Sequence, residues 1–560
     1  MPSYRTPGVY VEEISTLPPS VAEVSTAVPA FFGYTERGSG IARVSTLLEF
    51  EEAFGGPQKS EYEVKTRPEN ADDASGPRVI DSIRRKEPQN PSSSLYYALS
   101  HYFANGGGSC YVVSVGAFGE LPQAAHFTDG LSLLAKEDEP TLLILTDAVN
   151  LDSAGYYTVA QAALAQCAKL GDRFTILDVK DGDVEAFRGP AGVGANNLKY
   201  GAAYHPYLQT TLTRRYDEGG VTIVGSDGGG AQTSSLTFGA DGVVVTFTGG
   251  GAAPQAKFTL GDANLDLAIA VDGATNQLTV GNVRDRTGAD VAAAWTAWKA
   301  ENDAAGFEVA AAGDGSGAID TLGSNFNSLV AAEGGGASST TLAAIKAGAS
   351  PETALYNSIR TALAAERVVL APSAAIAGVY AEVDRTRGVW KAPANVSVSS
   401  VIGPVAKINN DEQDRLNVDA TGGKSINAIR AFAGKGTLVW GARTLAGNDN
   451  EWRYVPVRRL FITVEESVQK ATAFAVFEPN DSTTWLKVKG MVESYLYGLW
   501  EQGALAGSSP DAAYFVNVGL GKTMTPQDVL EGRMNVEIGL AAVRPAEFII
   551  LRFSHKLQEA

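Results

Sequence analysis

Two glycine-lysine stretches are the first places where this sequence could do chemistry, because such loops can cradle phosphates. They are TGGKS (residues 421–425) and GLGKT (residues 519–523). A phosphate-binding loop also needs a glycine five residues before its Gly-Lys pair, since its backbone amides must curl around the phosphate oxygens. Those positions hold Val418 and Val516. We therefore interpret both stretches as surface turns.

No other pattern of side chains predicts catalysis or metal binding. The sequence contains neither a GxSxG nor an HExxH motif, and its acidic pairs are adjacent in sequence, which is typical of solvated faces. Cys110 and Cys167 have no CxxC partner, and the four histidines are scattered. We expect no catalytic residue, no cofactor and no metal, and the protein is predicted not to be an enzyme.

Length and charge narrow the classes of partner. A chain of 560 residues should divide into several domains. The formal net charge of −18 disfavours nucleic acid and anionic lipid as main partners. No apolar run approaches the ~18 residues that a membrane span needs, and no signal peptide is recognised at the N-terminus. We expect the protein to be folded in the cytoplasm without inserting directly into a membrane.

The first part of the chain predicts alternating strands and helices. A strand is expected in TAVPAFFGYT, a helix followed by a strand in SSSLYYALSHYFANGGGSCYVVSV, and a second alternation through TLLILTDA, QAALAQCAKL and RFTILDV. This order is typical of a partly parallel sheet covered by helices.

A glycine-rich region follows, from about residue 218 to residue 350. SLTFGADGVVVTFTGG predicts two strands around an Asp241-Gly242 turn, and DVAAAWTAWKAEND predicts a helix with Val291, Trp295 and Trp298 on one side. We interpret this region as a small, mostly β inserted domain. A disordered insert is the alternative.

The last third predicts two amphipathic helices and several strands. RRLFITVEESVQKAT is one helix; the other begins at Asp481 or Ser482 and ends at Gly503. FAVFEPN is expected to be a strand that stops at Pro479, and AAYFVNV and RMNVEIGL are two more. Both ends of the chain carry strand-like runs, VYVEEI and FIILRF, with no hairpin partner beside them. An unpaired strand is an aggregation hazard unless it has a destined partner.

An ordered series of segments resembles the contractile tail sheath proteins of phage tails and related bacterial injection machines. The series covers residues 1–215 and 354–560 and leaves the 218–350 region unmatched. Its main segments are PGVYVEEIS, EAFGG, YFANGGGSCYVVSV, AGVYAEVDRTRGVWKAPAN, DEQDRLN, VWGARTLAG, WRYVPVRRLF, EESVQKATAFAVFEPND, LWEQGALAG and VEIGLAAVRPAEFIILRF.

The resemblance implies that terminal arms add strands to sheets of neighbouring subunits. The residues expected to make these contacts are Val9, Tyr10, Val11, Ile14, Phe548, Ile549, Ile550, Leu551 and Phe553. The strand expected to accept an arm carries Met534, Val536, Ile538 and Leu540. Pro18, Pro19 and Pro545 are hinge candidates, unless they are ordinary loop prolines. Lys487 and Lys489 are candidates to face the tube, unless they are solvated lysines beside a core stripe.

The resemblance further implies a structural subunit that polymerises as a six-start helix of hexameric rings and contracts from a metastable extended state. Its expected partners are further copies of itself, an inner tube protein that is driven through a target membrane, and baseplate and terminal cap proteins. Assembly is expected in the bacterial cytoplasm, before the sheath becomes part of a phage tail or of a released or anchored injection particle. A surface-layer or capsid-like protein, or an enzyme on the α/β region, are the alternatives.

The expected fold is a multi-domain α/β protein with a mixed α/β core, a C-terminal α+β domain, a mostly β insert and extended terminal arms. The predicted divisions are an N-terminal arm (1–25), the first part of an α/β domain (26–217), the outer insert (218–353), a return segment (354–390), an inner C-terminal domain (391–545) and a C-terminal arm (546–560).

Overall fold

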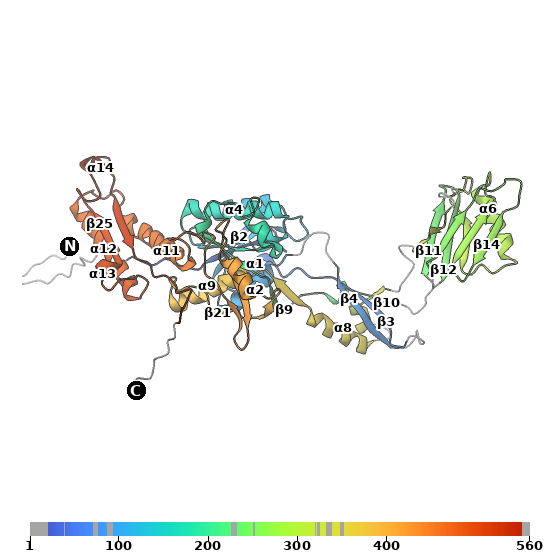
Figure 1. Cartoon of the computed structure of the whole chain (residues 1–560), viewed down its shortest axis with the longest axis horizontal. Helices are drawn as coiled ribbons and strands as arrows, with labels where there is room; N and C mark the ends of the chain where they lie inside the picture. Colours follow the sequence, from blue (N-terminus) through green and yellow to red (C-terminus); the bar gives the residue numbers. More distant parts are fainter. Residues whose placement is uncertain are drawn as a thin grey trace, which may run out of the picture. The chain divides into compact units, whose positions relative to one another are not determined.

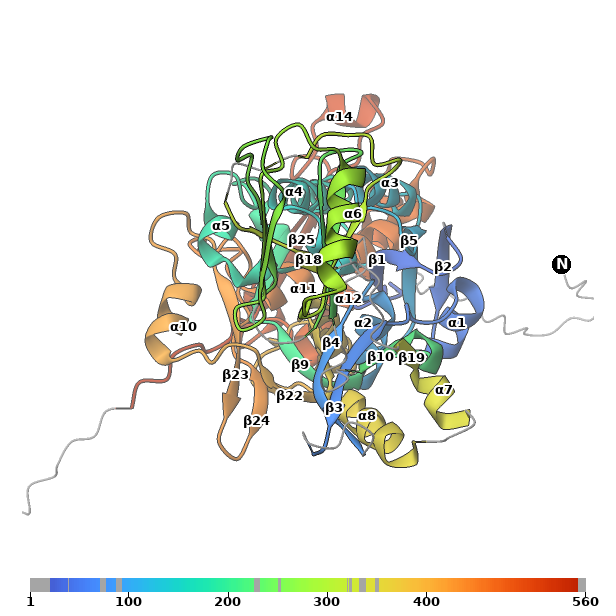
Figure 2. The ribbon, with the colours of Figure 1, turned by 90° about the vertical axis from the view of Figure 1, so that its right-hand side faces the viewer.

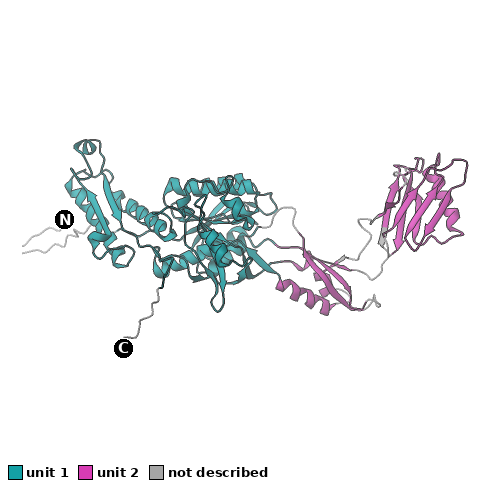
Figure 3. Ribbon diagram, viewed as in Figure 1, with its two compact units in different colours: residues 1–58, 87–215, 366–560 teal, residues 59–86, 216–365 magenta. Residues whose placement is uncertain are grey.

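The computed structural model describes most of the chain. The residues that it describes are 21–38, 40–70, 77–86, 93–225, 232–249, 253–319, 321, 325–331, 339–347 and 352–551. The chain forms two compact units, shown in different colours in Figure 3. Unit 1 comprises residues 1–58, 87–215 and 366–560, and unit 2 comprises residues 59–86 and 216–365.

A nine-stranded mixed sheet forms the centre of unit 1 (Figure 1). Its order is β2-β5-β1-β6-β7-β8-β23-β24-β21, and the run from β5 to β23 is parallel. The strands are β1 (Pro29–Thr35), β2 (Gly40–Val44), β5 (Cys110–Ala117), β6 (Leu142–Ile144), β7 (Phe174–Asp178), β8 (Gly201–His205), β21 (Val396–Ser397), β23 (Ile426–Phe432) and β24 (Gly436–Val439). The expected parallel core is confirmed.

Helices cover both faces of this sheet because its central strands are apolar on both sides. Phe32 packs with α3 and α4 in one core, whereas Phe31 packs with α1, α2 and α9 in the other. The helices of this part are α1 (Leu47–Phe54), α2 (Leu95–Ala104), α3 (Ala124–Leu134), α4 (Ser153–Leu170), α5 (Val184–Arg188), α9 (Ser373–Arg387) and α10 (Asn410–Asn417). A separate three-stranded sheet has the order β20 (Arg367–Leu370), β9 (Leu208–Thr213), β22 (Val401–Pro404).

The C-terminal layer of unit 1 packs two long helices against a two-stranded ribbon. Its elements are α11 (Val455–Ala471), α12 (Ser482–Glu501), α13 (Pro510–Ala513), β25 (Tyr514–Val518), α14 (Pro526–Leu530) and β26 (Val536–Leu540). Asp481 caps α12 by accepting hydrogen bonds from the amides of Thr483 and Thr484. The apolar stripe of α12 meets Leu460 and Val464 of α11 in one core, as its spacing predicts.

The FAVFEPN segment is not a strand, which corrects the sequence prediction. Residues Thr472–Ala475 form a 3-10 turn that continues α11, and the chain then bends at Phe477, whose φ is 67°. Phe474, Val476 and Phe477 are exposed. Strand propensity requires a paired edge, and no described strand lies beside this segment.

Unit 2 contains two separate cores. One sheet has the order β19 (Ser339–Thr341), β10 (Val221–Gly225), β3 (Tyr62–Pro68), β4 (Arg78–Arg85), and its core includes α7 (Leu342–Ala347) and α8 (Thr353–Ala365). Residues 59–86 therefore belong with unit 2, although the sequence analysis placed them in the 26–217 domain. Helix α8 likewise carries unit 2 beyond the predicted boundary at residue 353.

The second core of unit 2 is a β-sandwich with one helix. Its sheets have the orders β16-β12-β11-β18 and β14-β15-β13-β17, and Figure 2 shows α6 of the same core. The elements are β11 (Gln232–Phe238), β12 (Val243–Gly249), β13 (Gln255–Phe258), β14 (Ala268–Asp272), β15 (Gln277–Gly281), α6 (Gly288–Lys299), β16 (Phe307–Ala311), β17 (Asn327–Ser328) and β18 (Val330–Ala331). Trp295 is fully buried in it. The mostly β character of the insert is thus present in its described residues.

Candidate strand-acceptor groove

Strand β26 has one paired edge and one open edge. It pairs antiparallel with β25, from Tyr514 opposite Leu540 to Val518 opposite Val536. Among the residues that the structure describes, no strand lies on its other side. An open edge presents backbone N–H and C=O groups that can pair with another extended segment.

An apolar groove of about 930 Å³ lies between β26 and α11. Phe461, Val464 and Val468 line its helical wall at a spacing of three and four residues, so they share one face of α11. The opposite wall is formed by Met534, Val536, Ile538 and Leu540. The four residues that the sequence analysis assigned to an acceptor strand therefore lie together on one side of a groove.

The turn after α11 forms part of the groove's rim. Val476 and Phe477 line the groove, and the Phe477 side chain is fully exposed in the single chain. A φ of 67° is an unusual backbone conformation for an aromatic residue. Such conformations often occur where a ligand or partner is held. Sequence reasoning missed this feature because the apolar run looked like an ordinary strand.

The arm residues near the N-terminus, Val9, Tyr10, Val11 and Ile14, lie outside the described residues, as do Pro18, Pro19 and Phe553. Near the C-terminus, residues 548–551 are described and lie outside any helix or strand. Their exposed fractions are 71% for Phe548, 80% for Ile549, 78% for Ile550 and 72% for Leu551. Four consecutive large apolar side chains exposed to water indicate a segment that a partner covers.

An ion pair fixes the point where this C-terminal segment leaves unit 1. The Glu547 carboxylate accepts hydrogen bonds from Nε and Nη2 of Arg443, at 2.9 and 2.6 Å, and others from Asn417 and Tyr454. Burial alone would raise the pKa of Glu547, but the hydrogen bonds from Arg443 and Asn417 hold that pKa below its ordinary value. We call this cluster the Glu547 clip. Glu547 is a single acid before an apolar run, which is a weak sequence signal for such a contact.

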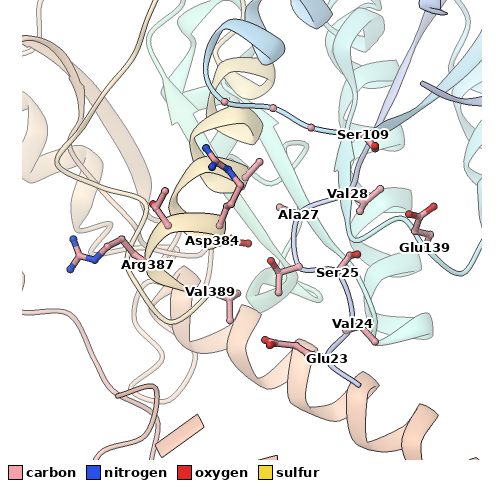
Figure 4. Close-up of a pocket in the computed structure, with 18 of the residues that line it drawn as sticks. Glu23, Val24, Ser25, Ala27, Val28, Ser109, Glu139, Asp384, Arg387 and Val389 are labelled. Carbon is pink, nitrogen blue, oxygen red and sulfur yellow. The ribbon is translucent and has the colours of Figure 1, made fainter. Parts of the chain in front are cut away.

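The described part of the N-terminal segment is also attached to unit 1. It runs beside a polar pocket, and Figure 4 shows residues Glu23 to Val28 passing between Glu139 and the end of α9. Burial, together with the nearby Asp384 carboxylate, raises the pKa of Glu23. The carbonyl of Thr26 accepts a hydrogen bond from Arg459 at 2.8 Å. An arginine of unit 1 thus binds the chain at Thr26, next to the predicted N-terminal arm, and another binds it at Glu547, at the start of the predicted C-terminal arm.

The remaining candidates have ordinary surroundings. Lys487 is exposed on α12, and Lys489 lies 3.4 Å from Glu493 one turn later in the same helix. Pro545 lies in an irregular stretch between β26 and the Glu547 clip. Their roles as tube contacts and hinge stay predictions.

The glycine-lysine stretches differ from each other. Lys424 is buried and donates a hydrogen bond to the carbonyl of Arg188 at 2.7 Å, so TGGKS is not wholly the surface turn that was predicted. GLGKT forms a turn closed by a hydrogen bond from the Thr523 amide to the Gly519 carbonyl. In the described part of the chain, no three His, Cys, Asp or Glu side chains are grouped as metal ligands, and no helix is both long and apolar enough to cross a bilayer.

Among known protein families, a match is found for the C-terminal layer of this chain. The family described as phage tail sheath C-terminal domain matches residues 447–556. The tail sheath protein of Vibrio phage KVP40 is 28% identical over 181 residues, which are 32% of this chain and 25% of that protein. The tail sheath protein of Enterobacteria phage T4 is 26% identical over 129 residues, 22% of this chain and 19% of that protein. These matches span a quarter or less of each curated relative.

Solved structures match along nearly the whole chain. A chain of the anti-feeding prophage baseplate is 26% identical, with a TM-score of 0.54 and coverage of 99% of this chain and 100% of that chain. The sheath complex of the extracellular contractile injection system PVC, in its contracted state, is 26% identical with a TM-score of 0.53 and 99% coverage of both chains. The contracted helical sheath of the anti-feeding prophage is 25% identical with a TM-score of 0.55, covering 99% of this chain and 100% of that chain. The C-terminal part of this chain thus matches the phage tail sheath C-terminal domain, and nearly the whole chain is similar to solved sheath subunits of contractile injection systems.

Proposed function

We propose that this chain is the repeating structural subunit of a contractile sheath. Copies polymerise as a six-start helix of hexameric rings around an inner tube protein, and baseplate and terminal cap proteins close its ends. Contraction from a metastable extended state drives the tube through a target membrane. The observation that carries the proposal is the open edge of β26 beside an apolar groove, in a chain that is similar to solved sheath subunits over 99% of its length.

The groove supports polymerisation by strand addition. An extended segment that pairs with β26 satisfies the backbone groups of the open edge, and its alternate side chains enter the groove. Val536, Ile538 and Leu540 provide an apolar wall for those side chains. The two terminal arms are the occupants that we propose, because both carry runs of large apolar residues and residues 548–551 are uncovered in the single chain.

Strand addition also suits a sheath that contracts. A single short strand gains only modest free energy when it docks, because ordering its backbone opposes the burial of its side chains. Each subunit in a lattice engages several neighbours, so weak links combine into a stable array. The bodies of the subunits can then slide past one another while the arms keep them joined. No nucleotide is required in this scheme, since the energy is stored in the extended lattice itself.

The tube contacts, the hinges and the place of assembly follow from the same function. The C-terminal layer faces the tube, with Lys487 and Lys489 as its contact candidates and Pro18, Pro19 and Pro545 as hinges. Assembly takes place in the bacterial cytoplasm, and the finished sheath belongs to a phage tail or to a tail-like injection particle. The protein binds neither nucleic acid nor lipid directly, in keeping with its net charge of −18.

Electron microscopy of the purified full-length chain tests this function. We expect helically striated hollow tubes from the wild-type chain. We expect no tubes from a variant that lacks residues 1–15, nor from Ile538→Lys, which places a charge in the groove wall. Leu530→Lys is the matched control, because Leu530 is highly exposed on α14 and does not line the groove.

The possible results test the sheath function and the strand-addition hypothesis separately. Tubes from both groove and arm variants would contradict strand addition but leave the sheath function intact. A wild-type chain that stays monomeric at high concentration, also in the presence of its tube protein, would contradict the sheath function.

A further inference from the structure

The chain after β26 is long enough to fold back onto its own groove. Seven residues, 541–547, separate Leu540 from the exposed segment 548–551. A β-hairpin needs a loop of only about two residues, so this connection could bring the segment beside the open edge of the same β26. A segment tethered in this way acts at an effective concentration of about millimolar. Self-docking would therefore outcompete docking between copies unless the fold prevents it.

The residues directly after β26 remain on the side of β25. The Ala541 amide donates to the Ala513 carbonyl at 2.8 Å, and the Ala541 carbonyl accepts from the Ala506 amide at 2.7 Å. The Val543 amide continues this pairing by donating to the Ala504 carbonyl. These contacts extend the pairing of β26 on its β25 side as far as Val543.

The Glu547 clip then draws the chain onto the α/β body. Its partners come from the end of α10, from the loop after β24 and from the residue before α11, where they are Asn417, Arg443 and Tyr454. In Figure 2 the described end of the chain runs beside α10. The Arg443 side chain is only 6% exposed, and the Glu547 side chain is 21% exposed. Releasing Glu547 would leave the buried guanidinium of Arg443 without its carboxylate. Detachment of the C-terminal segment from the clip is therefore unfavourable.

We propose that the Glu547 clip prevents the C-terminal segment from docking on its own β26, so that the groove receives residues 548–551 of a second copy. This inference rests on the strand-acceptor function proposed above. The charges of the groove fit this occupant. Glu478 lines it, as does Glu465, which is paired with Arg458, while Arg552 and Lys556 follow the segment in the sequence. The N-terminal arm carries Glu12 and Glu13 instead and is the less complementary occupant.

A photo-crosslink distinguishes docking within one chain from docking between chains. Phe548→p-benzoylphenylalanine is introduced into the full-length chain, once with natural nitrogen and once with 15N. The two preparations are mixed in equal amounts under dissociating conditions, returned to assembly conditions and irradiated. Mass spectrometry then identifies each crosslinked peptide pair and its isotopes. Docking between chains yields mixed pairs as half of all crosslinks, whereas docking within a chain yields none.

We expect crosslinks from residue 548 to peptides that contain β26 or Phe477, with mixed pairs close to half of the total. Glu547→Lys, which repels Arg443, should reduce the mixed share at least severalfold, and Glu547→Gln should reduce it less. Glu139→Lys is the matched control, because it breaks another two-point arginine contact in unit 1, between Arg43 and Glu139. Thermal unfolding of each variant verifies that it is folded.

Unchanged mixed crosslinks in both Glu547 variants would overturn the role of the clip and leave the acceptor groove in place. Crosslinks that never reach the groove, in any variant, would instead overturn the acceptor function on which this inference rests.

Discussion

Arg459 and Asp384 form a buried ion pair between α11 and α9, with Nη2 and Oδ2 2.5 Å apart. Their side chains are 3% and 4% exposed. Arg459 also donates to the carbonyl of Thr26, so the same guanidinium holds the described N-terminal segment. Burial alone would lower the pKa of Arg459, but the Asp384 carboxylate keeps it above its ordinary value. Arg459 therefore remains charged, and it binds the chain next to the predicted N-terminal arm.

Removing one partner of this pair should be costlier than removing both. We expect Asp384→Ala to destabilise the chain by about 3–5 kcal/mol, because it leaves Arg459 charged and buried without a counter-ion. The double variant Asp384→Leu with Arg459→Leu should lose less stability. Urea unfolding compares the three proteins. A double variant that is less stable than the single variant would show that the arginine contributes mainly through Thr26 and packing.

The Glu547 clip should depend on pH with a defined sign. Because the pKa of Glu547 is lowered in the folded chain, the clip stabilises the protein above the ordinary value of 4.5 and is lost as the pH falls through the lower folded-state pKa. We expect Glu547→Gln to cost about 1–3 kcal/mol at pH 7 and less at pH 3. Chemical unfolding at both pH values measures this difference. An equal cost at both would mean that the carboxylate charge contributes nothing.

The contribution of Asp178 to stability should change with pH in the opposite direction to that of Glu547. Asp178 is fully buried and accepts hydrogen bonds from the amide and the hydroxyl of Ser373, but burial still raises its pKa to about 7. A raised folded-state pKa favours the neutral acid, so the contribution of Asp178 is greatest below its ordinary value of 3.8 and is lost as the pH rises to about 7. We expect the stability of the wild-type chain relative to Asp178→Asn to fall by up to about 4 kcal/mol between pH 4 and pH 8. A relative stability that does not change with pH would contradict the raised pKa.

Phe477 should matter more to assembly than to the fold. Phe477→Gly relieves the positive φ, so we expect the single chain to keep its stability or gain about 1 kcal/mol or less. The same change removes an aromatic side chain from the rim of the groove, so tube formation should weaken. Phe477→Ala separates the two effects, since it removes the ring but keeps the strain. Phe515→Ala is the control on the other face of the ribbon, and light scattering follows assembly.

The β-sandwich of unit 2 should be removable. Val224 of β10 pairs with Ser339 of β19 in antiparallel register, so the chain leaves and returns at adjacent points. We expect that replacing residues 225–338 by an Asn-Gly turn leaves the rest of the chain folded, because that turn suits a two-residue hairpin. Thermal unfolding and electron microscopy report on the fold and on assembly. Loss of the remaining fold would show that the sandwich contributes to the other cores.

Residue patterns within single segments predict much of this fold. The apolar stripe of α12, the alternation of Val536, Ile538 and Leu540 in β26, and the Asp241-Gly242 turn between β11 and β12 all depend on neighbours within a few residues. Such features follow from the periods of helices and strands, and the ordered series of segments added the family resemblance. The apolar face of β26 that lines the groove could be named for the same reason, since one face of a strand is visible in its own sequence.

Only the tertiary structure decided what lies far apart in the chain. Residues 59–86 join unit 2 because β3 pairs with β10, and nothing in the segment itself specifies that partner. FAVFEPN has strand propensity but no edge to pair with, so it forms a turn with Phe477 at the rim of the groove. Arg443 and Glu547 meet across more than a hundred residues because the sheet and α10 bring their backbones together. The sequence by itself determined which segments could be helices, strands and arms. The folded chain decided which edge stays open and where each arm begins, because both depend on contacts between distant residues.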